Sequence, residues 1–202
     1  STGANNPWLK RYVGPDDGLL GPNPNNNHWN TPKPGGRSVC VHAFIGQLKD
    51  GSIATYQTLP WDHRGWHAGG KANDTHIGFE ICEDGLNDPT YFAAVYREAV
   101  ELCAYLCKKY GLTEKDVICH SEGYKLGIAS NHADVMHWFP KHGKTMDDFR
   151  ADVRKELLKG GTAVADKDKP SSWAKEAWEW AIKEGITDGT NPQGAITREQ
   201  VV

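Results

Sequence analysis

The sequence predicts an α/β fold in which a central mixed β-sheet is flanked by helices. Two short segments, 38–45 and 77–82, are apolar enough to be strands. A third segment, 53–59, follows a Lys-Asp-Gly-Ser turn and should return as the second strand of a hairpin. Apolar residues recur at helical spacing over 89–110, which predicts a long helix packed on that sheet.

The strand at 38–45 is expected to be buried on both faces. Valine, alanine and isoleucine side chains alternate with a second set that includes His42 and Phe44, so both faces are largely apolar. The strand at 77–82 differs because it carries Glu80 among apolar neighbours. A carboxylate is costly to bury unless it is paired or useful, so Glu80 is a candidate functional residue.

The long helix has clear boundary signals. Asp88 is placed to cap it, Pro89 suits its first turn and Gly111 should end it. The helix over 89–110 is therefore the best defined element in the sequence.

Three further elements are expected around it. A short helix fits 8–13, and a short buried strand fits 117–119. Thr145 and Asp148 resemble a capping box, which predicts a helix that begins there and ends at Gly160.

Composition limits the class of protein. The chain has 202 residues, 38% of them hydrophobic, and fits one soluble domain with a small extra unit. With 23 Lys and Arg against 26 Asp and Glu, the net charge of -3 disfavours a nucleic-acid partner.

No apolar run reaches the ~18 residues that cross a membrane. The start has no signal-peptide pattern, so synthesis in the cytoplasm is expected, and the five cysteines are expected to be reduced.

The chain is expected to divide into three parts. A main domain covers 1–159, a linker covers 160–171 and a short helical tail covers 172–202. The linker sequence GGTAVADKDKPS is small, charged and contains proline. The tail is too short to bury its tryptophans alone, so it should either dock on another surface or remain loose.

The segment 119–140 concentrates side chains that bind metals. Imidazole and carboxylate groups suit a divalent ion such as zinc, and an irregular loop can direct several of them at one point. Each histidine taken singly is more often packed or on the surface, but a cluster favours a metal site. The segment, which is rich in Gly, Ser and Asn and predicts neither helix nor strand, contains His120, Glu122, His132, Asp134 and His137.

Five motifs in order resemble the type 2 N-acetylmuramoyl-L-alanine amidases, whose fold is shared by peptidoglycan recognition proteins and many phage endolysins. The motifs are SVCVHAFIG, LKDGSIATYQ, RGWHAGG, HIGFEI and the segment from CHSEG to NHAD. They cover the chain from about its first residue to Leu158. The resemblance implies a zinc hydrolase that cuts the bond between the lactyl group of muramic acid and L-alanine, so peptidoglycan is the expected substrate.

The resemblance implies three protein ligands for zinc. His120 matches the second ligand and Asp134 the third, although the spacing between them is longer than usual, so His132 or His137 is an alternative third ligand. The first three residues, STG, resemble the remainder of a His-Ser-Thr-Gly motif, which would place the first ligand immediately before them. We therefore expect this chain to bind zinc weakly.

The resemblance also assigns catalytic and binding residues. Glu80 matches the glutamate that moves protons between water and the leaving amine, with an ion pair to Arg64 or Lys71 as the alternative role. His132 stands where relatives carry a lysine that is thought to stabilise the oxyanion. Four ring side chains match positions in or beside the substrate groove: His42, Trp66, His67 and Trp138.

The tail resembles the start of an S-layer homology repeat, which implies anchoring to secondary cell-wall polymers.

The main expectation is an endolysin or autolysin that acts at the cell wall, after release by a phage or after secretion. A second hypothesis is a module that binds muropeptides without cutting them. A hydrolase that uses Ser121 or Ser130 is disfavoured, because no nucleophile-elbow glycine pattern is present.

Overall fold

The computed structural model describes residues 1–3, 5–159, 179–180 and 182–184. The chain divides into two compact units, residues 1–157 and 158–202. The linker predicted over 160–171, and most of the S-layer-like segment predicted over 172–202, lie outside the described residues.

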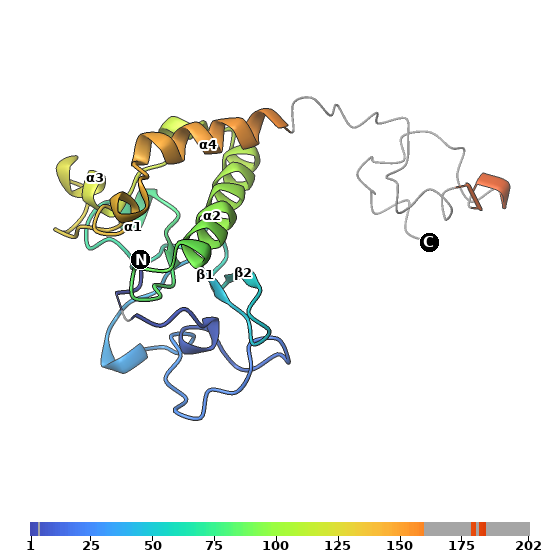
Figure 1. The fold of residues 1–202 in the computed structure, drawn as a ribbon, viewed down its shortest axis with the longest axis horizontal. Helices are drawn as coiled ribbons and strands as arrows, with labels where there is room; N and C mark the ends of the chain where they lie inside the picture. The colour runs from blue at the N-terminus through green and yellow to red at the C-terminus, as the bar shows by residue number, and fades with distance from the viewer. Residues whose placement is uncertain (4, 160–178, 181, 185–202) are drawn as a thin grey trace. The chain divides into compact units, whose positions relative to one another are not determined.

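The sheet of the first unit has three strands and is mixed, as predicted. The strands are β1 (Ala43–Gln47), β2 (Ile53–Gln57) and β3 (Phe79–Ile81), in the order β2-β1-β3. β1 and β2, labelled in Figure 1, form the predicted hairpin and are antiparallel. β1 and β3 are parallel. Phe44, in the central strand, lies opposite Tyr56 on one side and Glu80 on the other.

Helices cover one face of this sheet. The two longest are α2 (Pro89–Tyr110) and α4 (Met146–Lys159), at the predicted positions. Two short helices, α1 (Ala72–Thr75) and α3 (His120–Lys125), lie in segments that the sequence suggested were irregular. None of the described helices is long and apolar enough to cross a membrane. Single 3-10 turns occur at Leu9–Arg11, Pro34–Gly36, Glu114–Asp116 and Phe139–His142.

Both ends of α2 are formed as the sequence predicts. The Asp88 side chain accepts hydrogen bonds from the backbone N–H groups of Thr90 and Tyr91, which have no partner within the helix. Gly111 ends the helix with a φ of 67°, a conformation in which glycine carries no steric penalty.

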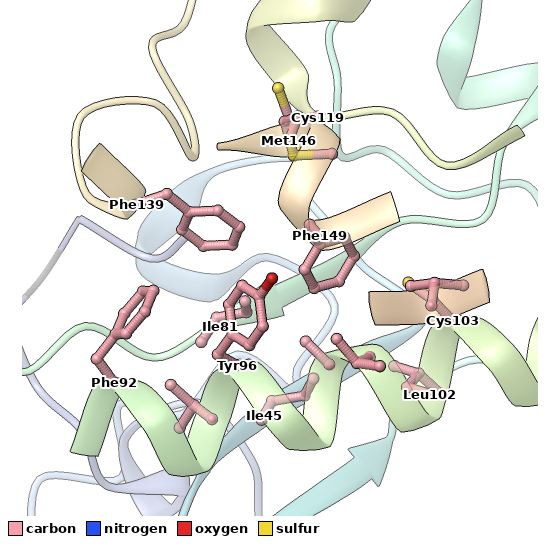
Figure 2. Close-up of a cluster of buried hydrophobic side chains, with 14 of the residues drawn as sticks. Ile45, Ile81, Phe92, Tyr96, Leu102, Cys103, Cys119, Phe139, Met146 and Phe149 are labelled. Carbon is pink, nitrogen blue, oxygen red and sulfur yellow. The ribbon is translucent and has the colours of Figure 1, made fainter. Parts of the chain in front are cut away.

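The main hydrophobic core lies between the sheet, α2 and α4. Figure 2 shows Tyr96 on α2 surrounded by aromatic rings from later in the chain. The Tyr96 and Phe149 ring centroids are 5.3 Å apart at 87°, and Phe92 and Phe139 meet edge to face at 5.5 Å. Such edge-to-face pairs add to the free energy gained by burying the rings.

A second core covers the opposite face of the sheet. Phe44 projects from β1 onto Tyr12, with ring centroids 5.4 Å apart, and Trp29 packs edge-on against both rings. Ala43 and Ile45 point into the main core, so β1 is buried on both faces, as the alternation in the sequence predicts.

The N-terminal segment pairs with the sheet at two places, first at β3 and then at the end of β1. The Thr2 N–H donates to the Ile81 carbonyl oxygen at 3.1 Å, on the outer edge of β3. Farther along, the Gln47 N–H donates to the Pro7 carbonyl oxygen at 2.8 Å, and Trp8 forms a parallel bridge with Gln47. This arrangement puts Ser1 beside Glu80.

Two predictions for the region before Asp134 are wrong. Residues 117–119 form no strand; they are extended and lead from a 3-10 turn into α3. The segment 119–140 also contains a helix, because Cys119 and Glu122 form a reciprocal capping box that satisfies the N–H groups at the start of α3.

Candidate active site

Glu80 and Asp134 meet beside the start of the chain. The Ser1 amine nitrogen lies 2.9 Å from Glu80 Oε2 and 3.5 Å from Asp134 Oδ2. The Glu80 side chain is 18% exposed, and its Oε2, which faces the Ser1 amine, is buried. Two carboxylates from distant segments thus share one small space.

This space favours a positive charge. Burial by itself lowers the pKa of the Ser1 amine, but the charges of Glu80 and Asp134 outweigh burial and raise that pKa from 8.0 to about 10. A cation placed between the two carboxylates is therefore stabilised electrostatically.

His120 is the first residue of α3 and faces the same region. Its Nε2 lies 3.1 Å from the Ser130 hydroxyl oxygen, and its ring centroid lies 4.9 Å from that of His132. Burial, followed by the proximity of His132, lowers the pKa of His120 below the usual histidine value. The ring is therefore held in the neutral form that binds metals.

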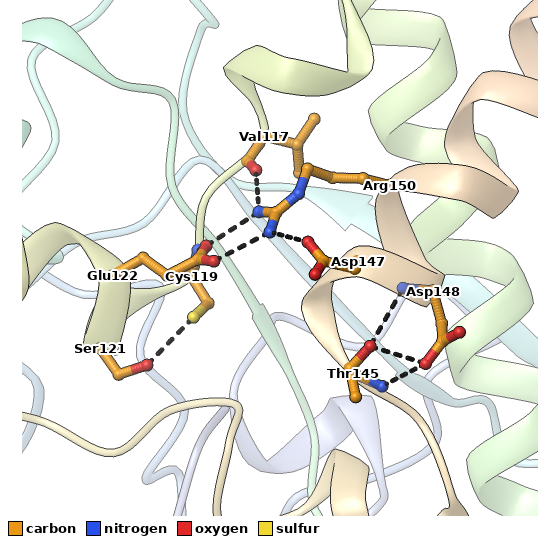
Figure 3. A network of polar contacts seen from close by, with 8 residues as sticks. All are labelled: Val117, Cys119, Ser121, Glu122, Thr145, Asp147, Asp148 and Arg150. Atoms are coloured by element: carbon orange, nitrogen blue, oxygen red, sulfur yellow. Dashed lines mark hydrogen bonds and ion pairs between the residues drawn. The ribbon is translucent and has the colours of Figure 1, made fainter.

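A charged network fixes the start of α3. Figure 3 shows Arg150 reaching from α4 to Glu122, which it contacts through Nη1 at 3.1 Å and Nη2 at 3.0 Å. The same Nη1 donates to the Val117 carbonyl oxygen, and Glu122 accepts the Cys119 N–H, each at 3.1 Å. The backbone on both sides of His120 is held in this way.

Asp134 is buttressed by His137 and by a buried acid that the sequence reasoning missed. The Glu83 side chain is only 3% exposed, and its Oε1 accepts a hydrogen bond from His137 Nε2 at 2.9 Å. His137 Nδ1 lies 3.6 Å from Asp134 Oδ1. The sequence signal was a second acid directly after the strand that carries Glu80, which by itself could equally have been a surface residue.

His42 and Trp138 are deeply buried, at 1% and 0% exposure. His42 Nδ1 accepts the Gly78 N–H at 3.0 Å, and Nε2 donates to the His63 carbonyl oxygen at 2.8 Å. Trp138 packs edge-on against Phe92 in the main core. Both rings are buried in this structure and offer no exposed face, so their predicted role in substrate binding stays a prediction.

Trp66 and His67 lie nearer the solvent. Trp66 is 50% exposed, and the guanidinium of Arg64 stacks 4.7 Å from its ring centroid. His67 is half-buried and donates from Nε2 to the His76 carbonyl oxygen at 3.0 Å, and burial lowers the pKa of His67 to about 4. Asn73 on α1 holds this loop, because its Oδ1 accepts the His67 N–H at 2.9 Å.

Four of the predicted residues line one cavity of about 770 Å³: His67, Glu80, His120 and Asp134. His132 is exposed and reaches this group only through its ring contact with His120. Trp66 is next in sequence to His67, which lines the cavity, whereas His42 and Trp138 are buried and are not among the lining residues. The structure thus brings the predicted acid, imidazole and carboxylate together from β3, α3 and the loop that follows α3.

The donor types fit zinc, but the donor count is incomplete. Neutral imidazole and carboxylate are common zinc ligands, and the ion pairs of Glu80 and Asp134 with the Ser1 nitrogen show that the two carboxylates face a place that favours a cation. Among the described residues, however, no group of three or more His, Cys, Asp or Glu side chains is arranged to hold a metal ion. His120 and Asp134 therefore fit as part of a site, not as a whole one.

The mixed sheet and its helices define an α/β fold. The cavity includes carboxylate and imidazole groups, which hydrolytic enzymes commonly use. Residues 14–140 match the family described as N-acetylmuramoyl-L-alanine amidase, and the chain belongs to that family. The fold is similar to that of the hydrolase AmiA of Staphylococcus aureus, solved in complex with its ligand, with 23% identity and a TM-score of 0.52. The similarity covers 62% of each chain. No curated protein matches the chain.

Proposed function

We propose that this protein hydrolyses the amide bond between the lactyl group of muramic acid and L-alanine in peptidoglycan, and that the reaction depends on zinc. One observation carries the proposal: Glu80, His120 and Asp134 come from three separate segments and line one cavity in a chain of the amidase family. A muropeptide binder that does not cut would have no need of all three groups.

His120 and Asp134 would be protein ligands of the zinc ion. A bound zinc ion supplies Lewis-acid chemistry, because it polarises the amide carbonyl and lowers the pKa of a bound water toward ~7. The lowered pKa of His120, which favours its neutral form, and the ion pairs that Glu80 and Asp134 share with the Ser1 nitrogen support this assignment. Glu83 and His137 would keep Asp134 in place from behind.

Glu80 would move the proton. As water attacks the carbonyl carbon, the Glu80 carboxylate accepts one proton and then returns it to the leaving nitrogen as the C–N bond breaks. The products are a carboxylate on the lactyl group and a free amino group on L-alanine. The position of Glu80 supports this role, because its carboxylate lines the cavity and is still partly exposed there.

His132 and the exposed aromatic surface would bind the substrate. His132, whose ring centroid lies 4.9 Å from that of His120, would stabilise the developing oxyanion, as the family's lysine is thought to do. Trp66 offers a half-exposed ring for glycan or peptide, with His67 beside it. The wall polymer expected to bind the tail, and the release or secretion of the protein, stay predictions.

Digestion of purified sacculi tests the proposed reaction. The expected result is release of L-alanine amino termini without new reducing sugars, and loss of that release after treatment with a chelator. New reducing sugars would indicate a glycosidase and contradict the proposal.

A second candidate function is binding of muropeptides without cleavage. The incomplete donor set among the described residues favours it. Cosedimentation with sacculi but no released amino termini, in protein saturated with zinc, would support this second function over the first.

A further inference from the structure

Ser130 lies where the loop after α3 meets the loop that carries His67. Its backbone N–H donates to the Ala68 carbonyl oxygen at 2.8 Å, and its hydroxyl oxygen lies 3.1 Å from that same carbonyl oxygen. The hydroxyl oxygen also lies 3.1 Å from His120 Nε2. One serine thus connects a backbone carbonyl to the imidazole of a candidate ligand.

The hydrogen count limits how both contacts of the Ser130 hydroxyl can be hydrogen bonds at the same time. A serine hydroxyl has one proton, and a carbonyl oxygen can only accept. If the Ser130 hydroxyl donates to Ala68, it must accept at its other contact, so His120 has to donate from Nε2. Both hydrogen bonds can therefore form only when the His120 proton is on Nε2, which leaves the lone pair on Nδ1.

Two glycines permit this arrangement. A Cβ atom on Gly69 would lie 2.8 Å from the Ser130 hydroxyl oxygen, and one on Gly70 would lie 2.5 Å from the Ile128 carbonyl oxygen. The Ala72 N–H also donates to that Ile128 carbonyl oxygen at 2.9 Å. The two loops are therefore in close contact, and Ser130 has little freedom to turn away.

We propose that Ser130 is a positioning residue that holds His120 as the Nε2–H tautomer and leaves Nδ1 as its metal-binding atom. The inference rests on the proposed function, in which His120 is a zinc ligand. A ligand histidine commonly donates its second ring N–H to a fixed acceptor, which sets both the tautomer and the orientation of the ring. Here the acceptor is a hydroxyl that is itself anchored to the Ala68 backbone.

The tautomer of His120 can be measured without metal. Long-range ¹H–¹⁵N spectra distinguish protonated from unprotonated ring nitrogens, and a pH well above the usual histidine pKa of about 6.5 keeps the ring neutral. In the wild-type chain we expect a protonated Nε2 and an unprotonated Nδ1. The reverse assignment in the wild-type chain would overturn the proposal.

The Ser130→Ala variant tests whether Ser130 is responsible. We expect its His120 signals to move to the averaged shifts of two exchanging tautomers. Ser121→Ala is the matched control, because the Ser121 hydroxyl contacts Cys119 Sγ at 3.2 Å and not the imidazole. An unchanged Nε2–H tautomer in folded Ser130→Ala would overturn the role of Ser130.

Zinc affinity, measured by competition with a coloured chelator, provides a second readout. Loss of a partner of this kind commonly weakens metal binding by roughly 10–100-fold, so we expect such a loss in Ser130→Ala and none in Ser121→Ala. Equal affinities in wild-type protein and Ser130→Ala would contradict the inference. Failure of the wild-type chain to bind zinc at all would instead count against the proposed function, and the metal-free spectra would still decide the role of Ser130.

Discussion

Glu80 combines a partly buried carboxylate with a position between the sheet and the cavity. In Glu80→Gln the side chain keeps its size but can no longer accept and return a proton. We expect release of L-alanine amino termini from sacculi to fall by roughly 10²–10⁴-fold, while cosedimentation with sacculi is unchanged.

The control for this variant is Glu101→Gln. Glu101 lies on α2, where its exposed carboxylate pairs with Arg97, outside the cavity. Full activity in Glu80→Gln would remove Glu80 from the mechanism, and equal loss in both variants would point to a general effect on the fold.

His67 should make stability depend on pH. Burial lowers the pKa of His67 from 6.5 to about 4, so on acidification the unfolded chain takes up a proton before the folded chain does. The free energy of unfolding should therefore decrease as pH falls from about 6.5 to about 4, and this contribution should level off below that range.

Urea unfolding at a series of pH values checks this prediction. In His67→Gln the slope over that range should be smaller by up to about one proton per molecule. Identical slopes for wild type and His67→Gln would mean that the His67 pKa is not lowered in the folded protein.

At the scale of single residues, sequence reasoning selected four side chains that line the cavity but not the residues that contact and support them. Glu80 was detectable because a carboxylate inside an apolar strand requires an explanation. Glu83 and Ser130 gave no such signal, because each is recognised only by a contact with a residue from another segment, His137 or Ala68.

The N-terminal cap of α2 is local to that helix, so changing it should have only the effect of losing a helix cap. Asp88→Ala removes the acceptor of the Thr90 and Tyr91 N–H groups, and should lower the free energy of unfolding by about 1 kcal/mol. Asp88→Asn should keep most of that stability, since an asparagine oxygen also accepts. Urea unfolding measures both, and an equal loss in the two variants would contradict the capping role.

The ion pair between Arg150 on α4 and Glu122 on α3 should contribute more to the free energy of unfolding than an exposed ion pair does. Arg150→Met leaves Glu122 partly buried without its guanidinium partner, so we expect a loss of about 1–3 kcal/mol and faster hydrogen exchange at the Cys119 amide. Arg97→Met on α2 breaks a pair whose arginine is 81% exposed and should cost less than about 0.5 kcal/mol. Equal losses would show that the Arg150 contacts are only surface contacts.

At the scale of elements, sequence patterns located the helices and strands whose stabilising residues are close together in the sequence. The helix from Pro89 to Tyr110 carries its own cap, stop and apolar stripe, so its sequence is sufficient to define it. α3 spans six residues, too few to show a helical period, and its start depends on Arg150 from α4. The sequence could not reveal that dependence.

At the scale of the molecule, the first unit contains both hydrophobic cores. Leu157 is the last residue of α4 that packs against the main core. A chain that ends at Lys159 should therefore unfold in one cooperative transition, with a midpoint within about 4 °C of that of the full chain. Thermal unfolding measures this, and a broad or strongly lowered transition would contradict the predicted domain boundary.

The cavity is assembled from parts that are far apart in the chain. Thr2 pairs with Ile81, Ala68 with Ser130, and Glu83 with His137. Long-range closure of this kind comes late in folding. During translation, a nascent chain that has not yet emerged beyond His137 lacks part of the cavity lining and the partner of Glu83, so the cavity should not close until almost the whole first unit has been made.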